Sequence, residues 1–225
     1  MAIQPFQRLV SNTSSVRLGA DRDQAALNAA NNMGDTPTSI MHAQVPVWAS
    51  LKKFDNDTTV QTFSPFGGLL NPEYIWDQPT SEGQTVAFAI AAPIVGAIAT
   101  PSDFSVVLVA FADNAMEAKI ELFELIGDTF VKAAPQPAGL DEFLLVAGEP
   151  NMPAEGLTET QPFNWQDIRV YSTVFTSPPN PDNTRRFRIV VSFEVTNYLV
   201  PNPPQQPNPA GLQFMVDIYR NILGS

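Results

Sequence analysis

The single histidine, His42, is the first candidate for a catalytic residue. A Ser-His-Asp or Cys-His arrangement needs a histidine as its base, and the chain contains no cysteine for His42 to activate. His42 lies in the segment SIMHAQVP, before the first strand-like run, and we interpret it as an ordinary polar or half-buried residue. With one histidine and no cysteine, the sequence predicts no metal site built on these ligands and no cofactor.

Acidic residues are the next candidates, because two carboxylates can hydrolyse a glycosidic bond. That chemistry needs two acids about 5–10 Å apart on one concave surface. On a strand, Glu117 and Glu121 point the same way but lie about 13 Å apart at about 3.3 Å per residue, and Glu124 points to the other face. We therefore predict no catalytic residue, and we expect that the protein is not an enzyme.

Two short acidic clusters resemble parts of a calcium loop. Asp55 and Asp57 lie in FDNDTT, and Asp21 and Asp23 lie in ADRD. Neither cluster continues into the spaced acidic pattern with a distal glutamate that such a loop needs. Turn formation and a helix start account for both clusters, and calcium binding stays open at this stage.

Three aromatic residues could bind a ligand. Tyr74 and Trp76 in LNPEYIWDQP, and Trp165 in QPFNWQDI, lie in segments flanked by proline. Aromatic rings exposed on loops can stack on sugar rings, which predicts a carbohydrate-type binding module as the alternative function. The other interpretation is that these rings close the ends of a sandwich.

The charge of the chain excludes several classes of partner. Its 23 acidic and 12 basic residues give a net charge of −11, with a net of −9 in residues 101–160 and +1 in residues 161–225. Nucleic acid binding needs clustered Lys and Arg, so we expect no nucleic acid partner.

No apolar run reaches the roughly 18 residues that cross a bilayer, and we expect no membrane insertion. The N-terminal residues do not form a secretory signal, so we expect synthesis in the cytoplasm.

The elements that must carry these residues are predicted mainly as strands. Residues 1–42 are predicted to form an arm with one short helix starting near Asp21, and residues 43–200 to form a β core. FSVVLVAF (104–111) is apolar on both faces, which is typical of a strand covered on both sides. Gly127 and Asp128 predict the turn of a hairpin.

The last quarter of the chain carries the clearest alternation. Five apolar residues alternate along one strand: Phe187, Ile189, Val191, Phe193 and Val195. Residues 201–211 are predicted to be a Pro-rich linker, and residues 212–225 an apolar strand or tail. A strand is favoured there by alternation, whereas a helix would bring together Leu212, Met215, Val216, Tyr219 and Ile222.

These patterns predict an all-β fold: an antiparallel two-sheet β-sandwich, jelly-roll-like, with about ten strands. For function, they predict a structural subunit of the coat, capsid or appendage type that assembles with copies of itself. Its C-terminal segment would pair with an open sheet edge of another copy, and an Arg-containing edge would meet the acidic middle of a neighbour. The expected assembly contacts are Arg185, Arg186, Arg188, Phe214, Val216 and Ile218. In the other interpretation, the tail folds back onto its own sheet.

Overall fold

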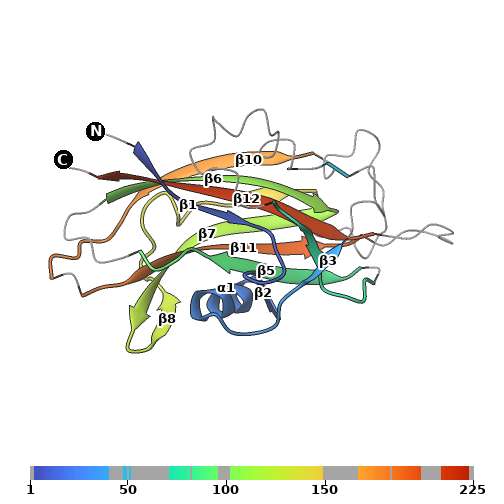
Figure 1. Cartoon of the computed structure of the whole chain (residues 1–225), viewed down its shortest axis with the longest axis horizontal. Coiled ribbons are helices and arrows are strands. Elements are labelled where there is room, and N and C mark those ends of the chain that lie inside the picture. Colours follow the sequence, from blue (N-terminus) through green and yellow to red (C-terminus); the bar gives the residue numbers. More distant parts are fainter. Residues whose placement is uncertain are drawn as a thin grey trace, which may run out of the picture.

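Twelve strands and one helix make up the described part of the chain. The computed structural model describes residues 3–40, 48–49, 51, 71–81, 83–95, 102–148, 167–182, 184–198 and 209–222. In these residues, two antiparallel six-stranded sheets pack against each other, and the helix lies on the outside of one of them (Figure 1). The expected two-sheet β-sandwich is confirmed.

Sheet A and sheet B draw their strands from all parts of the chain. In order, sheet A contains β10 (Arg169–Thr176), β6 (Ser102–Asp113), β12 (Gly211–Ile222), β4 (Tyr74–Trp76) and β3 (Thr38–Ile40), with β1 (Ile3–Val10) also paired to β12. Sheet B contains β2 (Arg17–Gly19), β5 (Thr85–Ala91), β11 (Phe187–Thr196), β7 (Ala115–Ile126) and β8 (Thr129–Lys132), with β9 (Leu145–Ala147) paired to β7.

The two sheets meet through the alternating residues of β11 and β12. Phe193 and Phe214 are both fully buried, and their rings stack with centroids 4.5 Å apart. Every second residue of β11 joins the same core cluster, as the sequence predicts. The core therefore joins β11 and β12, which follow each other in the chain but belong to different sheets.

The predicted hairpin is confirmed. Ile126 at the end of β7 pairs with Thr129 at the start of β8, so Gly127 and Asp128 form a two-residue turn. Gly127 has a φ of +62°, a conformation that L side chains rarely adopt, which explains why glycine occupies this position.

The predicted helix is α1 (Arg22–Asn31), and it begins at the expected residue. The carboxylate of Asp21 accepts a hydrogen bond from the backbone N–H of Gln24 at 2.7 Å, which caps the helix. Four buried alanines face sheet B: Ala25, Ala26, Ala29 and Ala30. Their small side chains allow the helix to lie directly on β5 and β11 and to cover the outer face of sheet B.

The expected N-terminal arm is instead part of the sandwich. β1, β2 and β3 each pair with a strand of the predicted core or C-terminal segment. Leu9 is buried in the core, and the ring of Phe6 packs edge-to-face on Phe104 at 5.8 Å. Polar residues and Pro5 interrupt the apolar pattern of β1, so the sequence did not indicate a strand there.

The C-terminal segment also lies within its own molecule. β12 is a strand rather than a helix, and it pairs with β6 along its whole length, from Gly211 opposite Asp113 to Ile222 opposite Ser102. β1 and β4 pair with the other side of β12. The alternative interpretation, in which the C-terminal tail folds back onto its own sheet, is therefore confirmed, because β12 pairs with β6 on one side and with β1 on the other.

Some predictions fall outside the described residues. The first strand-like run, which follows His42 in the sequence, lies mostly outside them, as do His42, the aspartates at 55 and 57, and most of the Pro-rich stretch 201–211. Among the described residues, no helix has the length and apolar character needed to cross a bilayer.

Candidate assembly surface

β6 is apolar on both of its faces, and only one of them lies in the core between the sheets. Phe104, Val106 and Leu108 point into the core and are at most 1% exposed. Val107 and Val109 point to the outer face of sheet A and are half-buried. Around Val107 and Val109, the outer face of sheet A is therefore apolar where a solvated sheet face is usually polar.

One end of this outer face is covered by the chain itself. Trp48 packs against Tyr74 and Phe111, with ring centroids 5.1 and 6.0 Å away. Leu51 is fully buried in a small cluster with Val10 and Met215. Trp48, Ala49 and Leu51 therefore cover sheet A near the end of β6 that carries Phe111.

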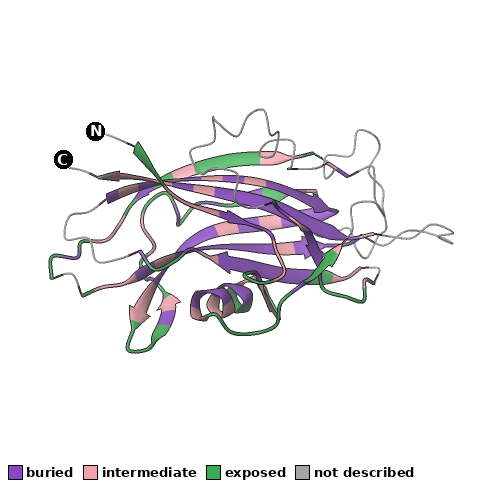
Figure 2. Ribbon diagram, in the orientation of Figure 1, coloured by how far each residue is buried: buried purple, intermediate pink, exposed green. Residues whose placement is uncertain are grey.

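The rest of the outer face is open in the described structure. Val170 and Val174 of β10 are 63% and 59% exposed, and Ile3 of β1 is 70% exposed. Figure 2 shows β10 as largely exposed, next to the buried strands of the same sheet. The cross-strand register places Val170 beside Val109, and Ser172 beside Val107, on this face. We name the surface formed by Ile3, Val107, Val170 and Val174 the β10 surface.

β10 is an edge strand with backbone groups directed away from its sheet. The backbone N–H of Ser177 donates to the carbonyl of Ser102 at 2.9 Å, and hydrogen-bonded pairs alternate along an antiparallel ladder. Odd-numbered residues of β10 therefore bond to β6, and the backbone of Val170, Ser172 and Val174 points away from β6. At Val174 this edge is covered by Gly139, so the open backbone groups are those of Val170 and Ser172. Gly139 lies against the carbonyl of Val174, where an added Cβ would come within 2.3 Å of the oxygen.

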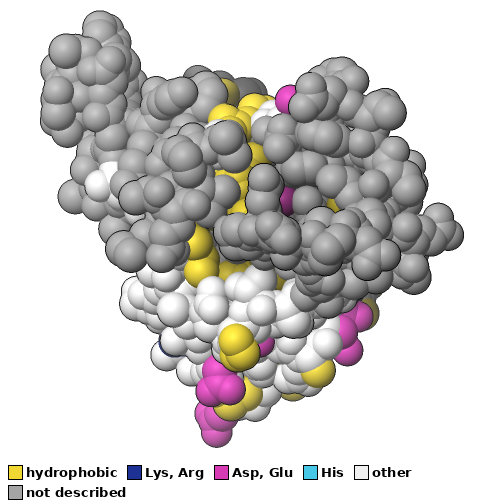
Figure 3. Space-filling model, turned by 90° about the vertical axis from the view of Figure 1, so that its right-hand side faces the viewer, with side chains coloured by type: hydrophobic (Ala, Val, Ile, Leu, Met, Phe, Trp, Pro, Cys, Tyr) yellow, Lys and Arg dark blue, Asp and Glu magenta, His cyan; other side chains and the backbone are white. Residues whose placement is uncertain are grey.

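The charged groups described on the outer face of sheet A near β10 include an ion pair and Asp103 of β6, whose carboxylate accepts from the hydroxyl of Thr176 at 2.7 Å. Arg8 and Asp217 form a two-pronged ion pair on the outer face of sheet A, with N–O distances of 2.5 and 2.6 Å. β10 itself contains one basic residue, Arg169, and no acidic residue. At the end of the sandwich seen in Figure 3, in contrast, acidic side chains are visible in several places and basic ones hardly at all.

The arginines expected to contact a neighbouring copy make contacts within the molecule instead. Arg185 forms a bidentate pair with Glu124 at 2.6 and 2.7 Å, and this pair holds the pKa of Glu124 below its usual value. Arg186 donates to the backbone carbonyl of Arg185 at 3.2 Å. Arg188 donates to the carbonyl of Ala30. The acidic middle and the Arg-containing edge meet inside one molecule, because β7 and β11 are adjacent strands.

The apolar residues expected to pair with another copy belong to the core. Phe214, Val216 and Ile218 of β12 are all fully buried between the two sheets. They are therefore not surface contacts in this structure. The physical reason is that the even-numbered residues from Leu212 to Ile218 face the opposite sheet, while β6 on one side and β1 and β4 on the other pair with β12.

Two of the three candidate ligand-binding aromatics are core residues as well. Tyr74 is 3% exposed and Trp76 is 0% exposed, because β4 lies within sheet A rather than in a loop. The indole N–H of Trp76 donates to Gln84, and the hydroxyl of Tyr74 donates to the carbonyl of Ala49. Trp165 lies outside the described residues. The prediction that Tyr74 and Trp76 form an exposed binding platform is wrong.

The acidic candidates serve structural roles where they are described. Glu117 pairs with Arg22 at 3.2 Å, and Glu121 pairs with Lys132. Asp21 caps the helix. The described residues contain no group of three or more side chains placed to hold a metal ion. Sequence reasoning did not identify the exposed valines of β10, although apolar residues on both faces of IRVYSTVF were the available signal.

Comparison with known proteins gives no family for this chain. No protein-family model and no curated protein matches it. A solved structure with the description "CBM4 structure and function" is similar over 66% of this chain and 69% of that chain, with 13% sequence identity and a TM-score of 0.30. A likeness at this level carries no argument about function.

Proposed function

We propose that this chain is a structural subunit that assembles with copies of itself through the β10 surface. The observation that carries the proposal is the open apolar end of the outer face of sheet A. α1 covers the outer face of sheet B, and Trp48, Ala49 and Leu51 cover one end of sheet A. A second copy that packed on the open end, at Val170 and Val174, would cover the part of sheet A that is left exposed.

Clustering distinguishes this surface from ordinary exposed apolar residues. Single exposed valines are common on protein surfaces, whereas several on one sheet face are typical of an interaction site. Val170, Val174 and Ile3 are among the most exposed large hydrophobic residues described, and all three lie on this face. Burial of each side chain contributes about 1.5–3 kcal/mol, so a contact that covers all of them would be substantial.

A second copy is the partner that the charges favour. Two molecules that each carry a net charge of −11 repel each other, so they associate best where acidic residues are absent or paired. β10 has no acidic residue, and Asp217 is neutralised by Arg8. Asp103 of β6 lies at the end of this surface, where it accepts a hydrogen bond from Thr176. The open backbone groups at Val170 and Ser172 can also accept a strand from the neighbour.

Val174→Lys is expected to weaken this association about tenfold or more, which corresponds to about 1.4 kcal/mol. The substitution places a strongly hydrated charge on the apolar surface without disturbing the core, because Val174 is 59% exposed. Sedimentation equilibrium of the full chain over a range of concentrations provides the measurement. We expect the wild type to exceed the monomer mass of 24.5 kDa, and the variant to remain close to it.

Val146→Lys is the matched control. Val146 is 43% exposed but lies on β9 of sheet B, so this variant should associate like the wild type. Equal weakening in both variants would rule out the β10 surface as the contact. A wild type that stays at 24.5 kDa at every concentration would contradict self-assembly itself.

A further inference from the structure

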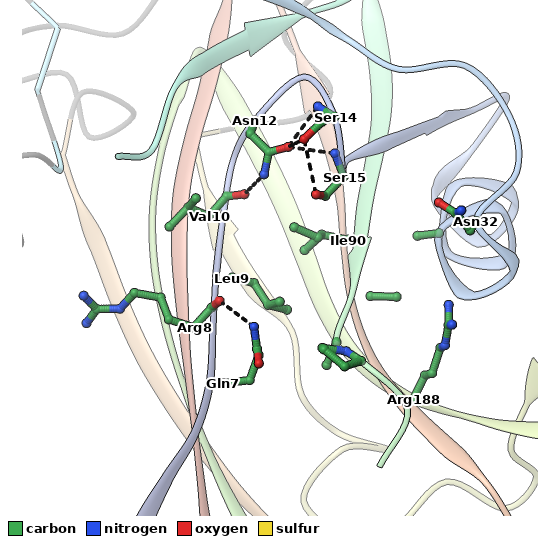
Figure 4. Close-up of a pocket in the computed structure, with 14 residues that line it drawn as sticks. Gln7, Arg8, Leu9, Val10, Asn12, Ser14, Ser15, Asn32, Ile90 and Arg188 are labelled. Carbon is green, nitrogen blue, oxygen red and sulfur yellow. Dashed lines mark hydrogen bonds between the residues drawn. The ribbon is translucent and has the colours of Figure 1, made fainter. Parts of the chain in front are cut away.

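A cleft of about 360 Å³ opens between β1, the turn that follows it, the C-terminal end of α1 and the end of β5. Leu9 and Ile90 form part of its apolar wall, while Ser14, Ser15 and Asn32 line its polar side (Figure 4). No aspartate or glutamate lines the cleft, although the chain contains 23 acidic residues. The cleft is therefore suited to a ligand of negative rather than positive charge.

Arg188 supplies the positive charge of the cleft. Its guanidinium donates to the carbonyl of Ala30 at 2.6 Å and stacks over the ring of Phe130 at 4.6 Å. The Nε atom of Arg188 is buried and has no hydrogen-bond partner, and burial lowers the pKa of the group. Among the residues that the structure describes, no carboxylate forms an ion pair with Arg188. A half-buried cation without an anion is unfavourable unless a counter-charge is supplied.

The other arginine of the lining is directed elsewhere. Arg8 points away from the cleft in Figure 4, because its guanidinium is held by Asp217 on the outer face of sheet A. Arg8 contributes to the wall of the cleft through its part of strand β1 and not through its guanidinium. In the described lining, the guanidinium of Arg188 is therefore the one cationic group available to a ligand in the cleft.

The polar side of the cleft is arranged to donate hydrogen bonds. The side-chain oxygen of Asn32 accepts from Arg17 at 2.5 Å, which leaves the amide N–H groups of Asn32 as donors. Asn12 accepts from the backbone N–H groups of Ser14 and Ser15 and from the hydroxyl of Ser14, which fixes the turn and leaves the hydroxyl of Ser15 as the donor. Hydroxyl and amide donors beside a guanidinium are the groups that recognise carboxylates and phosphates.

We propose that this cleft binds a small anionic ligand that carries a carboxylate or phosphate group, with Arg188 as the residue that pairs with the charge. The amide of Asn32 and the hydroxyl of Ser15 would donate to the remaining oxygens. The site does not involve the β10 surface, so it stands independently of the proposed assembly.

The competing role of Arg188 is purely structural. An arginine at the C-terminal end of a helix stabilises the last carbonyl groups, as the contact with Ala30 shows. In that role, loss of the charge lowers stability equally with and without an anion. Binding and capping therefore differ in whether the effect of the substitution depends on added anion.

The test titrates the full chain with inorganic phosphate, and separately with acetate, at ionic strength held constant with sodium chloride. We expect a saturable rise in melting temperature with at least one of the two anions, and the stronger one identifies the ligand group. In Arg188→Gln, the half-saturating concentration should rise at least tenfold, while the glutamine amide can still donate to Ala30. Arg22→Gln is the control, because Arg22 lies on α1 but pairs with Glu117.

A second variant keeps the test decisive if Arg188→Gln does not fold. Asn32→Asp adds a carboxylate to the cleft and should raise the half-saturating concentration by a similar factor. No saturable response of the wild type to either anion would overturn the proposal. Equal losses in Arg188→Gln and Arg22→Gln would also overturn it, because they would show a general charge effect.

Discussion

Replacement of Phe193 by Asp is expected to abolish cooperative folding. Phe193 is fully buried and stacks on Phe214 of the opposite sheet at 4.5 Å. Loss of a buried aromatic ring costs about 3–5 kcal/mol, and an unpaired carboxylate in the core adds several kcal/mol more. A typical domain has only about 5–15 kcal/mol of total stability. Thermal melts followed by near-UV circular dichroism should show no cooperative transition.

Ile126→Asp is the matched control for this prediction. Ile126 ends β7 beside the hairpin turn and is 63% exposed, so the same type of substitution there should leave the transition in place. A cooperatively melting Phe193→Asp protein would mean that the assigned facing of β11 is incorrect. Failure of both variants would point to a general intolerance of added acid rather than to the core.

Asp113 is expected to make stability depend on pH between about 4 and 7. This residue ends β6 and is 5% exposed; its carboxylate accepts from the indole N–H of Trp48 at 2.6 Å and from the amide of Asn114 at 2.5 Å. Burial raises the pKa of Asp113 from 3.8 to about 7, and the hydrogen bond from Trp48 opposes part of that rise. The folded protein therefore holds a proton on Asp113 that the unfolded chain releases.

The sign of the effect follows from the raised pKa. Below pH 4, Asp113 is protonated in both states, and its contribution to folding is fully present. As the pH rises to about 7, the unfolded state loses its proton first, so the free energy of unfolding falls by about 4 kcal/mol in total. Above pH 7 the contribution is constant. Other carboxylates titrate too, and Glu124, with its lowered pKa, acts in the opposite direction.

Comparison with Asp113→Asn isolates this residue. The variant keeps the shape of the side chain and does not ionise, so subtraction of the wild-type profile removes the other titrating groups. We expect the stability of the variant, relative to the wild type, to increase by about 4 kcal/mol between pH 4 and pH 8 in urea denaturation. Parallel profiles of the two proteins would show that Asp113 does not titrate in this range.

Local features of the fold were predictable from the sequence. The turn at Gly127 and Asp128, the helix start at Asp21 and the alternation of β11 each depend on interactions between near neighbours in the chain. The double-sided apolar character of 104–111 predicted a strand covered on both sides, but only one face of β6 lies in the core, and Val107 and Val109 on the other face are half-buried. The apolar residues on both faces of 168–175 were the sequence signal for the β10 surface, although they do not tell which of the two faces is exposed.

Long-range pairings were not predictable in the same way. β1 has Pro5 and several polar residues, and it becomes a strand because β12 offers an open side for pairing. Trp76 was expected on a loop because prolines flank its segment, yet β4 is held inside sheet A by β3 and β12. The residues within β1 or β4 do not indicate which distant strand will pair with them.

The charge pairs show the same limit. Net charges of sequence segments indicated an attraction between the acidic middle and the Arg-containing edge, and the attraction exists between Arg185 and Glu124. The pair lies within one molecule because β7 and β11 are adjacent strands. The net charge of a sequence segment gives no information about which strands are adjacent. The Arg188 cleft was likewise not predictable, since its walls come from residues up to about 180 positions apart.

The central position of β12 has a consequence for how the chain acquires its structure during synthesis. The ribosome completes residues 211–222 late, after every other strand of sheet A has been made. Until then β6 and β1 lack a partner on the side that β12 later fills, so the nascent sandwich presents open edges to other chains. Contacts between such distant segments also close slowly. We therefore expect newly made chains to be most vulnerable to aggregation just before β12 inserts.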